Sequence, residues 1–160
     1  MIPLRYIPKH LSAKDRKTVK KELRKSRKSY KKGKYHTRKK VKSFKSKKSN
    51  HVENAKRIYK IDTIYPSRKL AKACGCSVKT LELIMKKGQG AYFSSGSRPN
   101  QTGHSWGVAR LASAITGGKA SQVDLKHLIK GCKSNSKALR MAKKSKYKNK
   151  GRNKSRSTKL

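Results

Sequence analysis

The sequence is poor in acidic residues and in apolar residues. It holds 6 Asp and Glu against 47 Lys and Arg in 160 residues, which gives a formal net charge of +41. Hydrophobic residues make up 32% of the chain and aromatic residues 6%, whereas an ordinary globular domain is about 45–50% apolar. The sequence therefore predicts one small core at most.

Long apolar runs are also absent. A membrane-spanning helix needs about 20 consecutive apolar residues, and no stretch of this sequence approaches that length. Residues 1–10 lack the apolar centre of a secretory signal. We therefore expect a soluble chain that is made in the cytosol.

Cysteine is scarce and odd in number. In a chain without an export signal, Cys74, Cys76 and Cys132 are expected to stay reduced and to pack as small apolar side chains. A zinc site formed with His104 or His127 is the weaker interpretation, because the usual two-to-four-residue spacing of paired ligands is missing. We expect no metal and no cofactor.

The positive charge is densest at the two ends. Residues 1–50 hold 21 Lys and Arg and 2 acids, residues 133–160 hold 12 and none, and residues 51–132 hold 14 and 4. Like charges at this density repel one another unless an anionic partner neutralises them. We predict a mainly α protein with a compact helical core at 51–132, flanked by an extended basic N-terminal arm at 1–50 with one amphipathic helix and a basic C-terminal tail at 133–160.

The N-terminal arm contains one clear helix signal. Ser12 is a favourable N-cap for a helix over about 13–31. Val19, Leu23 and Tyr30 form a thin apolar stripe on this helix, and a glycine at 33 ends it. The polybasic connector 34–49 has no period, which is typical of a segment that is extended or disordered when free.

The central region has the periodicity of short helices. An Asn50–Glu53 capping box predicts one helix, Ser67 and Ser77 open two more, and Ser121 and Asp124 predict a start for another. The expected helices cover about 51–60, 68–74, 78–87, 104–116, 121–130 and, more weakly, 136–144. A loop rich in glycine and serine is expected at 88–105.

One helix pair resembles a helix-turn-helix. Ala71, Gly75 and Ser77 supply the small crossing residue, the turn glycine and the second cap. Lys79 would face outward from the second helix towards a phosphate or a guanine. The alternative, which we favour, is that the pair simply builds the core.

The 88–105 loop carries the other candidate groups. Ser95, Ser97, Arg98 and Asn100 could hold an anion or a partner through hydroxyls, amides and a guanidinium. A catalytic interpretation with Ser94, Ser95, His104 and Asp124 is weaker, because the sequence has no GxSxG nucleophile elbow. We expect no enzyme activity and identify no small-molecule substrate; ordinary local packing of the loop is the favoured interpretation.

Lysine outnumbers arginine, which suits diffuse phosphate neutralisation more than the bidentate recognition of bases. Tyr30, Tyr35 and Tyr147 lie among the lysines and could stack on unpaired bases. Residues 143–154 would also serve as a nuclear-import signal, although a simple neutralising tail explains them equally. The predicted polyanion-binding residues are Lys20, Lys21, Arg24, Lys25, Arg27, Lys28, Lys31, Lys32, Arg38, Lys39, Lys40, Lys143, Lys144, Lys146, Lys148 and Arg152.

Several blocks together resemble a known family. They are 5–12, 30–35, 42–47 and above all the glycine-serine-arginine-proline block and its flanks within 87–124. Over roughly residues 5–142 the chain is similar to an uncharacterised lysine-rich domain of nucleocytoplasmic large DNA viruses, phycodnavirus-like and mimivirus-like, with looser relatives in phages. The resemblance implies a setting in a large icosahedral DNA virus and no established activity.

In that setting the sequence predicts a non-enzymatic minor capsid or internal protein. Its basic segments would bridge capsid proteins and anionic partners, namely nucleic acid or the headgroups of an inner membrane. The alternative is a DNA-binding protein that compacts the viral genome without sequence specificity, and a ribosomal-protein-like RNA binder comes third. The expected location is the virion, on the inner side of the capsid or in the core, and the host cytoplasm or nucleus during infection.

Overall fold

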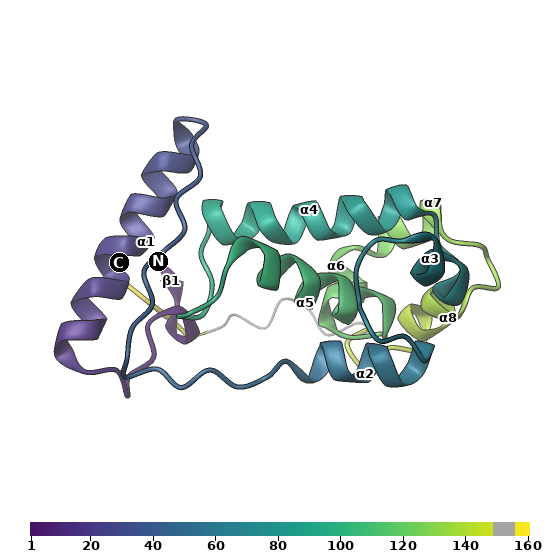
Figure 1. The fold of residues 1–160 in the computed structure, drawn as a ribbon, viewed down its shortest axis with the longest axis horizontal. Coiled ribbons are helices and arrows are strands. Elements are labelled where there is room, and N and C mark those ends of the chain that lie inside the picture. Colours follow the sequence, from purple (N-terminus) through teal and green to yellow (C-terminus); the bar gives the residue numbers. More distant parts are fainter. Residues whose placement is uncertain (149–155) are drawn as a thin grey trace. The chain divides into compact units, whose positions relative to one another are not determined.

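The computed structural model describes residues 1–148 and 156–160, and the described part is mainly helical, as predicted (Figure 1). Eight α-helices lie in these residues, together with one two-stranded antiparallel sheet. In the sheet, β1 (Ile2–Pro3) pairs with β2 (Ser157–Thr158), with Ile2 opposite Thr158. None of the helices in the described residues has the length and apolar character that a membrane crossing requires.

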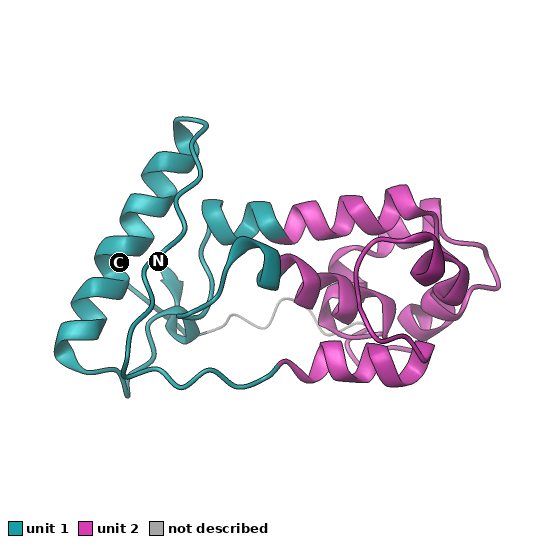
Figure 2. Ribbon diagram, in the orientation of Figure 1, with its two compact units in different colours: residues 1–48, 89–106, 152–160 teal, residues 49–88, 107–151 magenta. Residues whose placement is uncertain are grey.

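The chain forms two compact units (Figure 2). Unit 1 comprises Met1–Lys48, Gln89–Trp106 and the described residues 156–160, and unit 2 comprises Ser49–Gly88 and residues 107–148. This division differs from the predicted boundaries, because residues 89–106 join the N-terminal segment and residues 133–148 join the central helices. Residues 1–48 are therefore part of a folded unit and not a separate extended arm.

Unit 1 is built around α1 (Ala13–Lys31), which follows a short 3-10 helix at Leu4–Tyr6. The Ser12 hydroxyl accepts a hydrogen bond from the Asp15 amide, so the predicted N-cap is confirmed. The predicted glycine stop is also confirmed, since Gly33 just beyond the helix has a φ of +70°. After this turn the chain runs back beside α1 (Figure 1).

The core of unit 1 corrects the expectation of a single core. A cluster of buried apolar residues lies in this unit, with Phe44, Trp106 and Leu160 packed against it. The N-terminal segment supplies all of the buried members of this cluster, and Trp106 and Leu160, which are distant in sequence, pack against it. The buried members of the cluster are Ile2, Tyr6, Ile7, Leu11, Val19, Leu23 and Val41.

Unit 2 contains a larger buried cluster, in which Leu70, Leu81 and Ile115 are fully buried. Helices α4 and α5 begin or end in this unit and contribute residues to both units (Figure 2). The helices are α2 (Asn50–Tyr59), α3 (Arg68–Cys74), α4 (Val78–Ser94), α5 (Gly103–Ile115), α6 (Lys119–Val123), α7 (Leu125–Gly131) and α8 (Lys137–Lys143).

The loop predicted at 88–105 is largely helical, so that prediction was wrong in extent. Helix α4 continues through Gly88 and Gly90 to Ser94, and α5 begins at Gly103, which leaves only residues 95–102 between them. Glycine disfavours a helix by about 1 kcal/mol relative to alanine. Tertiary packing overrides this preference here, since Tyr92, in the part of α4 that continues beyond the predicted end of the helix, is fully buried.

Two other predicted helix starts were wrong. Ser49, and not Asn50, occupies the N-cap position of α2, and its side chain makes no capping hydrogen bond. The helix expected at 121–130 is broken at Asp124 into α6 and α7. Asp124 is completely buried and accepts hydrogen bonds from Nε and Nη2 of Arg110, both at 2.8 Å.

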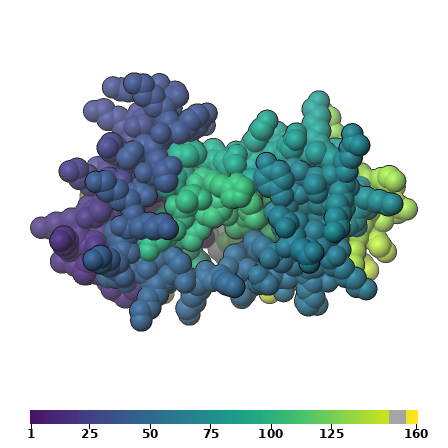
Figure 3. Space-filling model, viewed as in Figure 1, coloured from purple at the N-terminus to yellow at the C-terminus, as the bar shows by residue number. Residues whose placement is uncertain are grey.

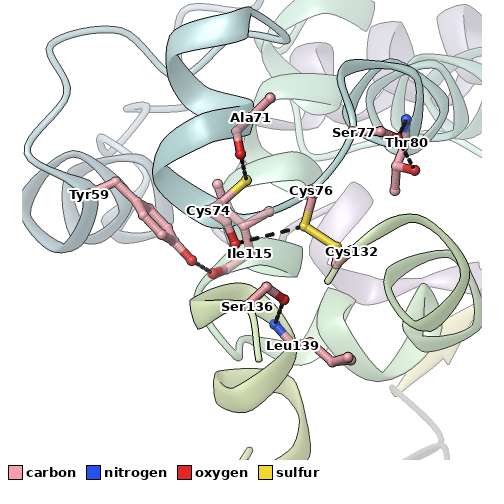
Figure 4. The surroundings of a disulfide bond; sticks show 10 residues. All are labelled: Tyr59, Ala71, Cys74, Cys76, Ser77, Thr80, Ile115, Cys132, Ser136 and Leu139. Carbon is pink, nitrogen blue, oxygen red and sulfur yellow. Dashed lines mark hydrogen bonds between the residues drawn. A yellow bond between two sulfur atoms is a disulfide. The ribbon is translucent and has the colours of Figure 1, made fainter. Parts of the chain in front are cut away.

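The cysteines differ from the expectation of reduced thiols. Cys76 and Cys132 form a disulfide, and only Cys74 remains a free, buried thiol (Figure 4). Burial raises the pKa of Cys74. The sequence did not predict the bond because its two cysteines are 56 positions apart, and they meet only when the α3–α4 turn pairs with residues 131–133. The Ser77 amide donates to Gly131 O and the Lys133 amide to Gly75 O, both at 2.9 Å.

Candidate polyanion-binding surface

The exposed face of α1 carries a row of cations. The buried residues of this helix are Val19, Glu22, Leu23 and Ser26. Because the helix repeats every 3.6 residues, the cations of the row lie together on the side opposite these buried residues. The row spans about 21 Å at a rise of 1.5 Å per residue. Its exposed members are Lys17, Lys21, Arg24, Lys28 and Lys31.

Most of the predicted polyanion-binding residues are exposed in the structure. N-terminal side chains, purple to blue, project from the surface in Figure 3. Lys20 and Arg27 are half-buried, and Arg152 lies outside the described residues. Lys17 was missed, although its spacing from the other members of the row was a signal for it. The exposed predicted residues are Lys21, Arg24, Lys25, Lys28, Lys31, Lys32, Lys39, Lys40, Lys143, Lys144, Lys146 and Lys148.

The two acids of residues 1–48 are both used inside unit 1. The Asp15 carboxylate accepts hydrogen bonds from the Ser43 amide at 2.8 Å and the Ser43 hydroxyl at 2.6 Å. These bonds hold the pKa of Asp15 below its ordinary value. Asp15 therefore fastens the connector to α1.

Glu22 does the same about two helical turns further along α1. Its Oε2 accepts hydrogen bonds from the Lys39 amide and from His36 Nε2, both at 2.9 Å. Burial raises the pKa of Glu22, but the hydrogen bonds from Lys39 and His36 outweigh burial and leave the pKa below its ordinary value. With both carboxylates engaged in this way, no side chain of the exposed row on α1 forms an ion pair with either of them in the described structure.

The loop between α4 and α5 binds the basic connector. The Val41 amide donates to Asn100 Oδ1 at 2.7 Å, and Asn100 Nδ2 donates to the carbonyls of Val41 at 2.9 Å and Phe44 at 3.0 Å. Ser95 and Arg98 of the same loop are exposed. In the loop predicted to bind an anion, the Asn100 side chain therefore binds the backbone of this chain's own connector.

Arg38 also faces into unit 1, so we remove it from the candidate polyanion-binding set. Its guanidinium donates to Ser26 Oγ at 3.1 Å, Tyr92 O at 2.7 Å and Ser97 Oγ at 2.7 Å. The same group lies 3.7 Å from the centroid of the Tyr92 ring, a favourable cation–π geometry. Burial lowers the pKa of Arg38, and the neighbouring Tyr92, Tyr6 and Glu22 act in the opposite direction.

The residues of the catalytic arrangement considered from the sequence fall in both units. Ser94 and Ser95 have their hydroxyls 3.4 Å apart. Asp124, the only acid considered as a partner for His104, belongs to unit 2 and is held by Arg110. Among the described residues, no three His, Cys, Asp or Glu side chains are grouped to hold a metal ion.

The helix-turn-helix-like pair contributes to the core of unit 2. Gly75 has a φ of +79°, and a Cβ at this position would lie 2.6 Å from the Cβ of Ser136, so glycine is required by conformation and by space. The Ser77 hydroxyl accepts from the Thr80 amide at 3.2 Å, and Ala71 packs against the buried cluster. Lys79 is exposed, as are its outward neighbours Glu82 and Leu83.

A second basic surface lies on α8 in unit 2. An open cavity of about 500 Å³ is lined by Lys137, Arg140, Lys144 and Lys146, with Thr116 and Ser145 among its other lining residues. No acidic side chain lines it. Tyr147, which follows this cluster, is half-buried.

Comparison with known proteins gives one match. A family model described as a family of unknown function (DUF5824) matches residues 3–128. The match begins in β1 and ends in α7, so it includes α1 and the polybasic connector. No curated protein and no solved structure matches the chain.

Proposed function

We propose that this chain, which belongs to the DUF5824 family of unknown function, is a non-enzymatic protein that binds nucleic acid without reading its sequence. The observation that carries the proposal is the exposed cation row of α1, none of whose side chains pairs with Asp15 or Glu22, because these carboxylates are engaged by Ser43, Lys39 and His36. Within the row, Arg24 donates to Leu160 O at 2.7 Å. A row of Lys and Arg on a stable helix neutralises phosphates and releases their counterions.

We expect no recognition of base sequence because most of the exposed cations are lysines. Lysine ammonium groups neutralise phosphate as point charges, whereas reading a base requires groups fixed in a groove. The outward face of the helix-turn-helix-like pair presents Lys79 beside Glu82 and Leu83, and Glu82 would be repelled by a phosphate backbone. The resemblance to lysine-rich domains of large DNA viruses supports the virion as the setting, with packaged DNA as the partner.

The salt dependence of duplex DNA binding tests this proposal. For B-DNA, log K falls against log salt with a slope of about −0.9 for each phosphate neutralised. Lys17, Lys21 and Lys28 are exposed on one face of α1. We expect replacement of all three by Gln to make the slope shallower by about 2 to 3, measured by fluorescence anisotropy from 50 to 200 mM salt.

A matched variant removes the same charge elsewhere. Lys69, Lys72 and Lys86 are exposed in unit 2, and their replacement by Gln should leave the slope within about one unit of that of the unchanged protein. Equal effects of the two triple variants would contradict the assignment of binding to α1. A protein that binds duplex DNA without salt dependence would contradict the whole proposal.

A capsid-bridging role is the second candidate, and one observation favours it. Unit 1 carries the α1 row and unit 2 carries the α8 cavity, and two basic surfaces on two compact units suit a protein that joins two acidic partners. Virions stripped of DNA distinguish the candidates. A bridging protein stays with the capsid at constant stoichiometry, whereas a genome-bound protein leaves with the DNA.

A further inference from the structure

The turn that follows α1 presents two tyrosines. Gly33 takes a φ of +70°, its amide donates to Tyr30 O, and the Lys34 amide donates to Ser29 O, both at 3.0 Å. This turn reverses the chain and places the Tyr35 ring 6.2 Å from the Tyr30 ring, measured between centroids. The two tyrosines therefore share one end of unit 1.

The Tyr35 ring packs against another aromatic ring, that of Phe93. Its centroid lies 5.0 Å from that of Phe93 at an interplanar angle of 57°, and Phe93 contacts Tyr92 edge-on at 4.9 Å. Phe93 is fixed in turn by α5, because a Cβ on Gly103 would lie 2.9 Å from its ring. Aromatic rings in tilted or edge-on contact at such separations attract one another, which holds the Tyr35 ring in place.

Despite this support, Tyr35 is 74% exposed and Tyr30 is 37% exposed. An exposed ring that packing already orients is suited to receive another flat group. Lys31, Lys32 and Lys34 precede it in sequence and are all exposed. The occupant that matches a π surface next to several cations is an anionic chain with accessible aromatic faces.

We propose that Tyr35, flanked by Tyr30, is a stacking platform for an unpaired base of single-stranded nucleic acid, with Lys31, Lys32 and Lys34 contacting the adjoining phosphates. This inference rests on the proposed nucleic-acid-binding function and adds a strand preference to it. A duplex keeps its bases stacked on one another, so only an unpaired base offers a face to the ring. Stacking tolerates every base and therefore agrees with binding that ignores sequence.

The experiment compares three polyanions at one salt concentration. Binding of the full chain to a fifteen-nucleotide oligothymidylate, to a fifteen-base-pair duplex and to heparin is measured by anisotropy or by competition. We expect Tyr35→Ala and Tyr35→Leu to weaken oligothymidylate binding about tenfold and to leave duplex and heparin binding within about twofold. Tyr35→Phe keeps the ring and should bind like the unchanged protein.

Two further variants act as controls. Lys34→Gln should weaken binding to all three polyanions, because it removes charge and leaves the ring. Tyr65→Ala removes a 51% exposed tyrosine of unit 2 and should change none of the affinities. The fluorescence of Trp106, which packs against the core of unit 1, reports whether each Tyr35 variant keeps its fold.

The outcomes separate this inference from the proposed function. Equal losses on oligothymidylate, duplex and heparin for Tyr35→Ala, or a loss for Tyr35→Phe as large as for Tyr35→Ala, overturn the stacking platform and leave polyanion binding standing. Failure of the unchanged protein to bind any of the three overturns the proposed function itself.

Discussion

At the residue scale, polar side chains do much of the work of folding unit 1. Glu22 and Asn100 satisfy the backbone amides of Lys39 and Val41, which belong to a connector without helix or strand partners. A buried amide without a hydrogen-bond partner costs about 1–3 kcal/mol. These side chains therefore hold in place a segment whose lysines would otherwise keep it in solvent.

Acid should release this connector. Because the pKa of Glu22 is lowered in the folded chain, its contribution to stability is present above the unfolded value of about 4.3 and is lost as pH falls through the folded value. We expect Trp106 fluorescence to report loss of unit 1 stability as the pH drops below about 4, with a shallower pH dependence in Glu22→Gln.

Glu53 supplies the control for that titration. Its carboxylate lies 4.0 Å from Lys56 Nζ in unit 2 with 60% of the side chain exposed, a pair that contributes about 0–1 kcal/mol. Glu53→Gln should therefore leave the Trp106 profile unchanged. Identical acid profiles for Glu22→Gln and the unchanged protein would show that Glu22 does not hold the connector.

At the element scale, a disulfide closes unit 2. Cys76 lies in the turn between α3 and α4, and Cys132 follows α7 immediately and precedes the residues that lead into α8 (Figure 4). The bond therefore links three helices that are separate in sequence. Its neighbours Cys74 and Ile115 are fully buried, so the bond lies at the edge of the core.

Loss of the disulfide should destabilise unit 2. For a separation of 56 residues, loop-closure entropy gives a stabilisation of about 4 kcal/mol. We expect Cys76→Ser with Cys132→Ser to lower the free energy of unfolding of unit 2 by up to about 4 kcal/mol, measured by urea unfolding followed by circular dichroism. Reductant should reproduce the loss in the unchanged protein and have no effect on the double variant; an unfolding midpoint that ignores reductant would contradict the prediction.

At the scale of the whole molecule, charge dominates. A net charge of +41 on 160 residues creates self-repulsion that favours expanded states. The structure relieves little of it internally, since the Lys and Arg ion pairs found among the described residues are Lys56–Glu53 and Arg110–Asp124. The remaining cations depend on counterions or on an anionic partner.

Salt should therefore act in opposite directions on folding and on binding. Raising sodium chloride from 20 to 300 mM shortens the screening length to below about 10 Å, which weakens self-repulsion and should raise the Tm by several degrees. Over the same range duplex DNA affinity should fall by orders of magnitude. Calorimetry measures the change in Tm and fluorescence anisotropy measures the change in DNA affinity on the same sample. A Tm that falls with salt would contradict the role given to self-repulsion.

The sequence alone was sufficient for features that depend on near neighbours. Ser12 and Ser67 cap their helices as predicted, and Gly75 ends α3 in the left-handed conformation, because a cap or a turn is decided within about four residues. The mainly helical fold and the exposed lysines of α1 follow from the same short-range rules together with composition.

Tertiary structure alone decided the rest. Three contacts join residues that are distant in sequence: Asn100 with Val41, Arg38 with Tyr92, and Cys76 with Cys132. The helix from Gly88 to Ser94 likewise forms against the preference of its glycines. The stabilising free energy of these features comes from burial and from partners that local propensity does not encode. Residues 1–48, whose composition predicts a free arm, therefore form part of a folded unit.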